Sequence, residues 1–212
     1  MRMTRTLSAS LLALALAACT TNTPLSSTST DAPRSLAGAV SAADPRAQAA
    51  GEEMLARGGS ATDAAIAVML ALGVVEPQSS GIGGGGFMVR GTADGSVGTF
   101  DGRETAPASA TPDWFLDENG QLPPFIESVR SGLSVGVPGN IALAAKAHAA
   151  YGKLPWASLF EPAIKLASQG FEMNPRLNGM LESARNRSAH WAQARSIFFD
   201  AEGHPLPVGT VV

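Results

Sequence analysis

The sequence has a single cysteine, few charged residues and no long apolar run at its N-terminus, and each shortage excludes a class of protein. Cys19 is the only cysteine among 212 residues, so no disulfide can form within the chain. Charged residues make up 16% and the net charge is −3, which offers no basic surface for nucleic acid. The apolar run 7–18 is shorter than the about 20 residues that a membrane-spanning helix needs. Hydrophobic residues still reach 45%, which suits a globular domain with a core.

The N-terminus has the pattern of a bacterial export signal. Arg2 and Arg5 precede the uncharged apolar run, as in a secretory signal peptide. The run ends in LAAC at Cys19, which resembles the lipobox whose cysteine carries a lipid. Thr20 follows, so no aspartate stands there to favour the inner membrane. We expect residues 1–18 to be a lipoprotein signal peptide and the product to be periplasmic, anchored at the outer membrane through Cys19. The alternative is an ordinary signal peptide followed by a chance cysteine.

Residues 19–37 and 38–212 differ sharply in composition. The first segment is rich in Ser, Thr and Pro and has too few apolar groups to pack, so it predicts a solvated tether. The second contains the capping residues and apolar periodicity of a folded domain.

Helix starts are predicted from capping residues and from prolines at the first helical position. The predicted starts are Asp44-Pro45, Ser60 with Asp63 as a capping-box partner, Thr111-Pro112, Asn140, Pro155 and, for a last helix, Asn174-Pro175. Residues 64–75 contain no polar side chain, which predicts a helix buried on all sides. The helix from Pro155 has an apolar stripe that includes Leu159, Ala163 and Ile164.

The strand predictions are few. Residues 87–90 and 97–100 flank the turn at Asp94-Gly95 and predict a hairpin. Residues 133–137 predict a further strand. Helices, a hairpin and then more helices indicate an α+β fold.

A glycine-rich loop stands between the second helix and the hairpin. Gly81, Gly83 and Gly86 match the spacing G-x-G-x-x-G of dinucleotide-binding loops. That motif requires a strand before it and a helix after it, and here the order is reversed. No lysine follows, as a phosphate-binding P-loop would require. We therefore expect the glycines to permit close backbone packing and positive φ angles.

Other catalytic patterns are missing from the sequence. His148, His190 and His204 do not have the spacing of metal ligands, and there is no G-x-S-x-G of a serine hydrolase. Arg103 follows a predicted strand, where a guanidinium can bind a carboxylate through two parallel hydrogen bonds. The alternative for Arg103 is an ordinary ion pair with Asp101 or Glu104.

Several blocks, in order, resemble the N-terminal part of the large subunit of γ-glutamyltranspeptidases: GGSATDAA, GIGGGGFM, GRETAPA, GVPG and LFEPAIKLASQGF. The resemblance extends from Ala43 to the chain end, roughly 170 residues. It implies part of the N-terminal-nucleophile hydrolase fold, a four-layer αββα sandwich. It also implies a precursor that cleaves itself into large and small subunits, and no metal or organic cofactor.

The resemblance further implies an activity. A threonine at the N-terminus of the small subunit attacks γ-glutamyl amides such as glutathione, and the glutamyl group passes to water, amino acids or peptides. By matching position, Arg103 would bind the α-carboxylate of that group. This sequence has no counterpart to the nucleophile, and Thr210 lacks the surrounding motif. We expect a fragment of a longer precursor or a truncated product, inactive alone. The alternatives are an inactive lipoprotein that keeps a remnant of the fold and a related cephalosporin acylase.

Overall fold

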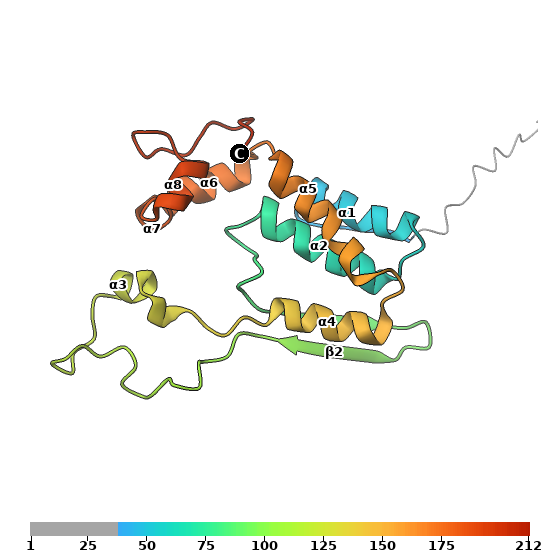
Figure 1. Ribbon diagram of the computed structural model, residues 1–212, viewed down its shortest axis with the longest axis horizontal. Coiled ribbons are helices and arrows are strands. Elements are labelled where there is room, and N and C mark those ends of the chain that lie inside the picture. The colour runs from blue at the N-terminus through green and yellow to red at the C-terminus, as the bar shows by residue number, and fades with distance from the viewer. Residues whose placement is uncertain (1–37) are drawn as a thin grey trace, which may run out of the picture. The chain divides into compact units, whose positions relative to one another are not determined.

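The computed structural model describes residues 38–212, and helices make up most of its regular structure (Figure 1). The α-helices are α1 (Pro45–Ala56), α2 (Ala61–Val75), α3 (Phe125–Arg130), α4 (Asn140–Tyr151), α5 (Glu161–Gln169), α6 (Pro175–Ser183), α7 (Arg185–Ser188) and α8 (Ala192–Phe198). The remaining elements are strands β1 (Gly86–Gly91) and β2 (Val97–Gly102) and the 3₁₀ helices η1 (Gly132–Ser134) and η2 (Trp156–Phe160). The predicted signal peptide, Cys19 and the tether lie outside the described residues. Within 38–212, every helix is too short or too polar to span a membrane.

The first two helices begin as their capping residues predict. Asp44 accepts a hydrogen bond from the backbone N–H of Arg46 at 2.8 Å, and Pro45 occupies the first helical position. Ser60 and Asp63 form a reciprocal capping box at the start of α2. Both helix starts are confirmed, and Gly58, with φ of 83°, turns the chain between the two helices.

The core lies around α2, which packs against α1, α4, η2 and α5 (Figure 1). Many of its buried side chains are alanines, and the larger fully buried apolar ones are Met54, Ile66, Val75, Leu159, Met173 and Leu177. The many alanines of α1 and α2 let the two helix backbones approach closely. Gly51 makes this concrete, because a Cβ there would come within 2.7 Å of Val68 and 2.9 Å of Val40.

The prediction that α2 is buried on all sides is wrong for one face. Ala65 is exposed, and Met69 and Leu72 are half-buried. Ala65 and Met69 border a cleft, although Met69 also packs in part against the core. An apolar composition therefore indicated burial correctly for the opposite face only.

The predicted hairpin is confirmed as an antiparallel pair, with Met88 opposite Phe100 and Val89 opposite Thr99. One face packs against α4, where the ring of Tyr151 contacts Phe100 edge-on at 6.1 Å between ring centroids. The opposite face carries Phe87 and Val89, which are 69% and 72% exposed. This face of the hairpin is therefore an exposed apolar surface.

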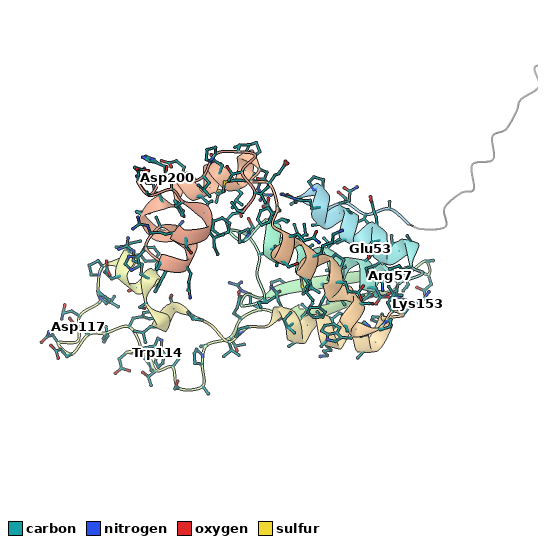
Figure 2. The ribbon with its side chains drawn as sticks, turned by 45° about the horizontal axis from the view of Figure 1, so that its top comes forward. Glu53, Arg57, Trp114, Asp117, Lys153 and Asp200 are labelled. Carbon is teal, nitrogen blue, oxygen red and sulfur yellow. The ribbon has the colours of Figure 1, made fainter. Side chains whose placement is uncertain are left out.

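Two local predictions between β2 and α4 are wrong. The segment from Thr111 forms turns instead of a helix, closed by short-range bonds such as Trp114 N–H to Thr111 O at 3.0 Å. Residues 133–137 hold η1 and a single bridge between Val137 and Thr105 instead of a strand. Figure 2 shows Trp114 and Asp117 on this connection, well away from Glu53, Arg57 and Lys153. Residues 111–122 are exposed apart from Trp114, so burial adds little to the weak local preference for a helix or a strand there.

The C-terminal helices differ from prediction in extent. The helix predicted from Pro155 is divided into η2 and α5, because Pro162 has no N–H and fits only the first turn of an α-helix. Ile164 belongs to the predicted apolar stripe but is 61% exposed. Asn174 caps α6 as predicted, accepting from Leu177 N–H at 2.7 Å. The short helices α3, α7 and α8 were not predicted, since helices of four to seven residues have little periodicity.

The carboxylate of Asp63 joins α2 to the segment that follows α4. Its Oδ2 atom accepts hydrogen bonds from the backbone N–H groups of Ser60 at 2.7 Å, Lys153 at 2.9 Å and Leu154 at 3.3 Å. Asp63 is 0% exposed, so no water can replace these bonds. Burial by itself would raise the pKa of Asp63, but the N–H donors outweigh it and hold the pKa below its ordinary value.

Replacing Asp63 with alanine should lower the free energy of unfolding by about 2–4 kcal/mol, because a helix cap is lost and buried N–H donors lose their acceptor. Urea unfolding of the wild type and the variant measures the difference. Glu118→Ala, on the exposed connection before α3, is the control and should change stability by less than about 0.5 kcal/mol. An Asp63→Ala variant as stable as the control would contradict the assigned role.

The contribution of Asp63 should also depend on pH. Because its folded pKa is depressed, its contribution is fully present above the unfolded value of about 3.9. The contribution is lost as the pH falls from there through the lower folded value. The stability gap between the wild type and Asp63→Ala should therefore stay constant from pH 7 to 5 and narrow below pH 4. A gap that does not change down to pH 2.5 would refute this account.

Candidate functional site

A cleft of about 790 Å³ lies between the hairpin, α2 and the start of α4. Its lining includes Ala65 and Met69 from α2, the glycine-rich segment 83–86, Arg103 and Glu104 after β2, and Asn140 from α4. Besides α2, the cleft thus brings together three segments that are apart in the sequence: the glycine-rich loop, the residues after β2 and the start of α4.

Three glycines allow the backbones of these segments to touch. A Cβ on Gly85 would lie 2.5 Å from the carbonyl oxygen of Gly102 and 2.6 Å from the N atom of Glu104. A Cβ on Gly139 would overlap the same carbonyl oxygen, and one on Gly102 would lie 2.5 Å from the Cβ of Leu143. No other residue type fits at these three positions without displacement of the backbone.

Hydrogen bonds join the glycine-rich loop to the start of α4. The carbonyl oxygen of Gly84 accepts from the backbone N–H groups of Gly139 and Asn140, each at 3.0 Å. The side-chain amide of Asn140 donates to the carbonyl oxygen of Gly81 at 2.7 Å. The loop is therefore fixed at Gly81 and at Gly84 by the same helix terminus.

The expectations for the glycine-rich loop are partly confirmed. Close backbone packing is confirmed at Gly85, whereas Gly81 and Gly83 have no neighbour within 4 Å of an added Cβ. The expected positive φ angles are wrong, because none of the residues 81–86 adopts one. The loop turns at residues 82–83 without a positive φ angle, closed by a hydrogen bond from Gly84 N–H to Gly81 O at 3.1 Å.

Arg103 lies at the rim of the cleft, directly after β2. Its backbone N–H donates to Asp101 Oδ1 at 2.9 Å, and its Nη1 lies 2.7 Å from Glu104 Oε2. The alternative of an ion pair with Glu104 is thus present in the structure. The Arg103 side chain nevertheless remains 66% exposed, so much of its guanidinium is open to a ligand.

Glu104 is more buried than Arg103. Its side chain is 27% exposed and lies under the backbone of Gly85. Its own backbone N–H, and after it the charge of Arg103, keep the pKa of Glu104 below its usual value. Glu104 therefore stays ionised and orients the guanidinium at the rim, an arrangement that suits binding of a small carboxylate ligand.

The histidines do not gather into a site. His148 lies 2.8 Å from the carbonyl oxygen of Leu154 through Nε2, and His204 lies 3.0 Å from Arg185 Nη1 through Nδ1. Among residues 38–212 no three His, Cys, Asp or Glu side chains are grouped to hold a metal. Sequence reasoning missed Asn140, although its place after the block GVPG could have indicated a contact at the start of α4.

Comparison with known proteins gives consistent matches. A family model described as γ-glutamyltranspeptidase matches residues 47–212. The glutathione hydrolase proenzyme of Bacillus subtilis strain 168 is 42% identical over 175 residues, which are 81% of this chain and 29% of that protein. The chain therefore spans less than a third of this curated relative.

Solved structures agree. The Helicobacter pylori γ-glutamyltranspeptidase aligns with a TM-score of 0.75 and 36% identity, covering 82% of this chain and 50% of that one. A cephalosporin acylase from Bacillus halodurans aligns with a TM-score of 0.62 and 31% identity, covering 78% of this chain and 31% of the other. These likenesses confirm the predicted fold class, an α+β portion of the N-terminal-nucleophile hydrolase fold.

The glycine contacts predict opposite results for two substitutions in β2. Gly102→Ala should lower the free energy of unfolding by about 1–3 kcal/mol, because its Cβ meets Leu143 and the carbonyl of Gly139. Gly98→Ala, four residues earlier, meets nothing within 4 Å and should be neutral or slightly stabilising. Thermal unfolding of both variants makes the comparison. Equal losses at the two positions would show that the contact at Gly102 is unimportant.

Proposed function

This chain belongs to the γ-glutamyltranspeptidase family, and on that premise we propose that it is the N-terminal portion of a γ-glutamyltransferase/glutathione hydrolase. Such an enzyme cleaves γ-glutamyl amides and passes the glutamyl group to water, amino acids or peptides. The observation that carries the proposal is the cleft in which Arg103 presents a largely exposed guanidinium beside an ionised Glu104.

Arg103 is the proposed binding residue for the substrate's α-carboxylate. A γ-glutamyl group carries a free α-carboxylate, and a planar guanidinium can bind it through two parallel hydrogen bonds. The ion pair with Glu104 uses Nη1, so the rest of the fork is left to a ligand. The Arg103 side of the pair is 66% exposed, so the guanidinium can turn toward a ligand, whereas the Oε2 atom of Glu104 is buried.

The attacking group is proposed to come from a small subunit made from the same precursor. A threonine at the new N-terminus would attack the γ-glutamyl carbonyl, its α-amine acting as base. The exposed apolar face of the hairpin, with Phe87, Val89 and Val97, supports a partner segment, since large apolar patches mark interaction surfaces. The 212-residue chain is therefore proposed to be inactive by itself.

Export and anchoring form part of the same proposal. Cys19, preceded by the signal-like segment 1–18, would attach a lipid and place the protein in the periplasm at the outer membrane. There it would act on γ-glutamyl compounds outside the cytoplasm.

A cephalosporin acylase is the second candidate, favoured by the likeness to the Bacillus halodurans enzyme. The two activities differ in the substrate group near Arg103. A γ-glutamyl donor needs a cation for its α-carboxylate, so activity of the acylase alone would leave Arg103 without this role. Parallel assays with a γ-glutamyl anilide and a cephalosporin amide separate the candidates.

In the complete translation product of the gene, Arg103→Ala should raise KM for a chromogenic γ-glutamyl anilide about 10–100-fold, because one charged hydrogen-bonding partner is lost. Arg103→Lys should recover only part of the affinity, since lysine keeps the charge but not the fork. Arg57→Ala is the control, because Arg57 is also ion-paired but directly follows α1 and does not line the cleft. An unchanged KM in Arg103→Ala would refute the assignment.

The proposal that this chain binds substrate and a small subunit supplies the nucleophile is tested on the 212-residue chain and on its gene. The purified chain should leave the anilide intact, and the reading frame beyond Val212 should encode a segment with the nucleophilic threonine. Hydrolysis by the chain alone would contradict the first statement. A stop codon directly after Val212, with no nearby small-subunit frame, would favour an inactive remnant.

A further inference from the structure

We propose that Asn140 is a positioning residue, which holds the glycine-rich loop 81–86 against α4 and thereby places Glu104 and Arg103 at the cleft. This inference rests on the proposed function for its effect on substrate binding. Its structural part, the fixing of the loop, stands on the contacts of Asn140 alone.

The side chain of Asn140 is committed to the loop and not to its own helix. Asn140 is the first residue of α4 and 6% exposed, and the N-cap residue is Gly139, which has no side chain to cap with. The amide of Asn140 instead donates to Gly81 O, 59 positions earlier, at 2.7 Å. A helix start does not require asparagine at this position, so the contact with the loop explains the residue best.

The loop in turn contacts the ion pair. Gly84 O accepts from two N–H groups of the α4 terminus, and the next residue, Gly85, lies against the backbone N and the carboxylate of Glu104. A Cβ on Gly85 would come within 2.7 Å of Glu104 Oε2, the atom that pairs with Arg103. A shift of the loop would therefore move the carboxylate that orients the guanidinium.

Asn140→Asp isolates this role. The aspartate has nearly the same shape, but it offers no donor to Gly81 O and would place a buried carboxylate against that carbonyl oxygen. In the complete translation product we expect KM for the γ-glutamyl anilide to rise about 10-fold with a smaller change in kcat, since substrate binding is what the loop supports.

Asn178→Asp is the matched control. Asn178 also donates its side-chain amide to a distant backbone carbonyl, Leu206 O, at 2.9 Å, but it lies on α6 outside the cleft. It should lose comparable stability while KM stays within about 2-fold of the wild type. A rise in KM as large as that of Asn140→Asp would show that general destabilisation explains both.

Hydrogen exchange gives a readout that needs no activity. In the 212-residue chain, the amides of Gly139 and Asn140, which donate to Gly84 O, should exchange about 10-fold faster in Asn140→Asp and unchanged in Asn178→Asp. Asn140→Ala, which removes the donor without burying a charge, should give the same pattern and serves if the aspartate variant does not fold.

The outcomes separate the two proposals. Unchanged exchange at the α4 terminus, or faster exchange with an unchanged KM, overturns the inference about Asn140. A wild-type product that does not cleave the anilide overturns the proposed function, while the exchange experiment still decides whether Asn140 fixes the loop. Faster exchange together with a selective rise in KM supports the inference.

Discussion

The described structure depends on the contact between three backbone segments at Gly85, Gly102 and Gly139. The segments approach so closely that a single added Cβ would meet a carbonyl oxygen or Leu143. This contact fastens the hairpin to the start of α4 and brings Arg103 and Glu104 to the cleft. The blocks GIGGGGFM, GRETAPA and GVPG thus follow from one steric requirement, since they meet at the same point.

In the site, the exposed Arg103 side chain pairs with a more buried Glu104. Glu104 lies under the loop backbone, Asn140 holds that loop, and Arg103 extends from them to the rim with most of its surface open. When a charged side chain is already oriented before the ligand arrives, binding of a carboxylate loses less side-chain entropy. The two proposed roles differ: Arg103 is the residue proposed to touch substrate, while Asn140 is proposed to act only through its neighbours.

The contrast between the two faces of the hairpin has a consequence for assembly. The inner face packs on α4 through Phe100 and Tyr151, whereas Phe87 and Val89 on the other face remain in water. Phe87, Val89 and the half-exposed face of α2 all border the cleft that Arg103 lines. A chain with apolar surface beside its binding residues is suited to receive a further segment there, as the proposed small subunit requires.

Local rules foresaw much of this protein from residue types alone. The caps at Asp44, Ser60 and Asn174 and the turn at Gly95 were predicted because each depends on neighbours within a few residues. The family and the α+β class followed from ordered motif blocks. Contacts between distant segments were beyond such rules: the exposed face of α2, the close approach of Gly85 to Gly102, and the bond from Asn140 to Gly81 across 59 positions. These depend on which backbones meet in space, and only the packing of α2, the hairpin and α4 decides that.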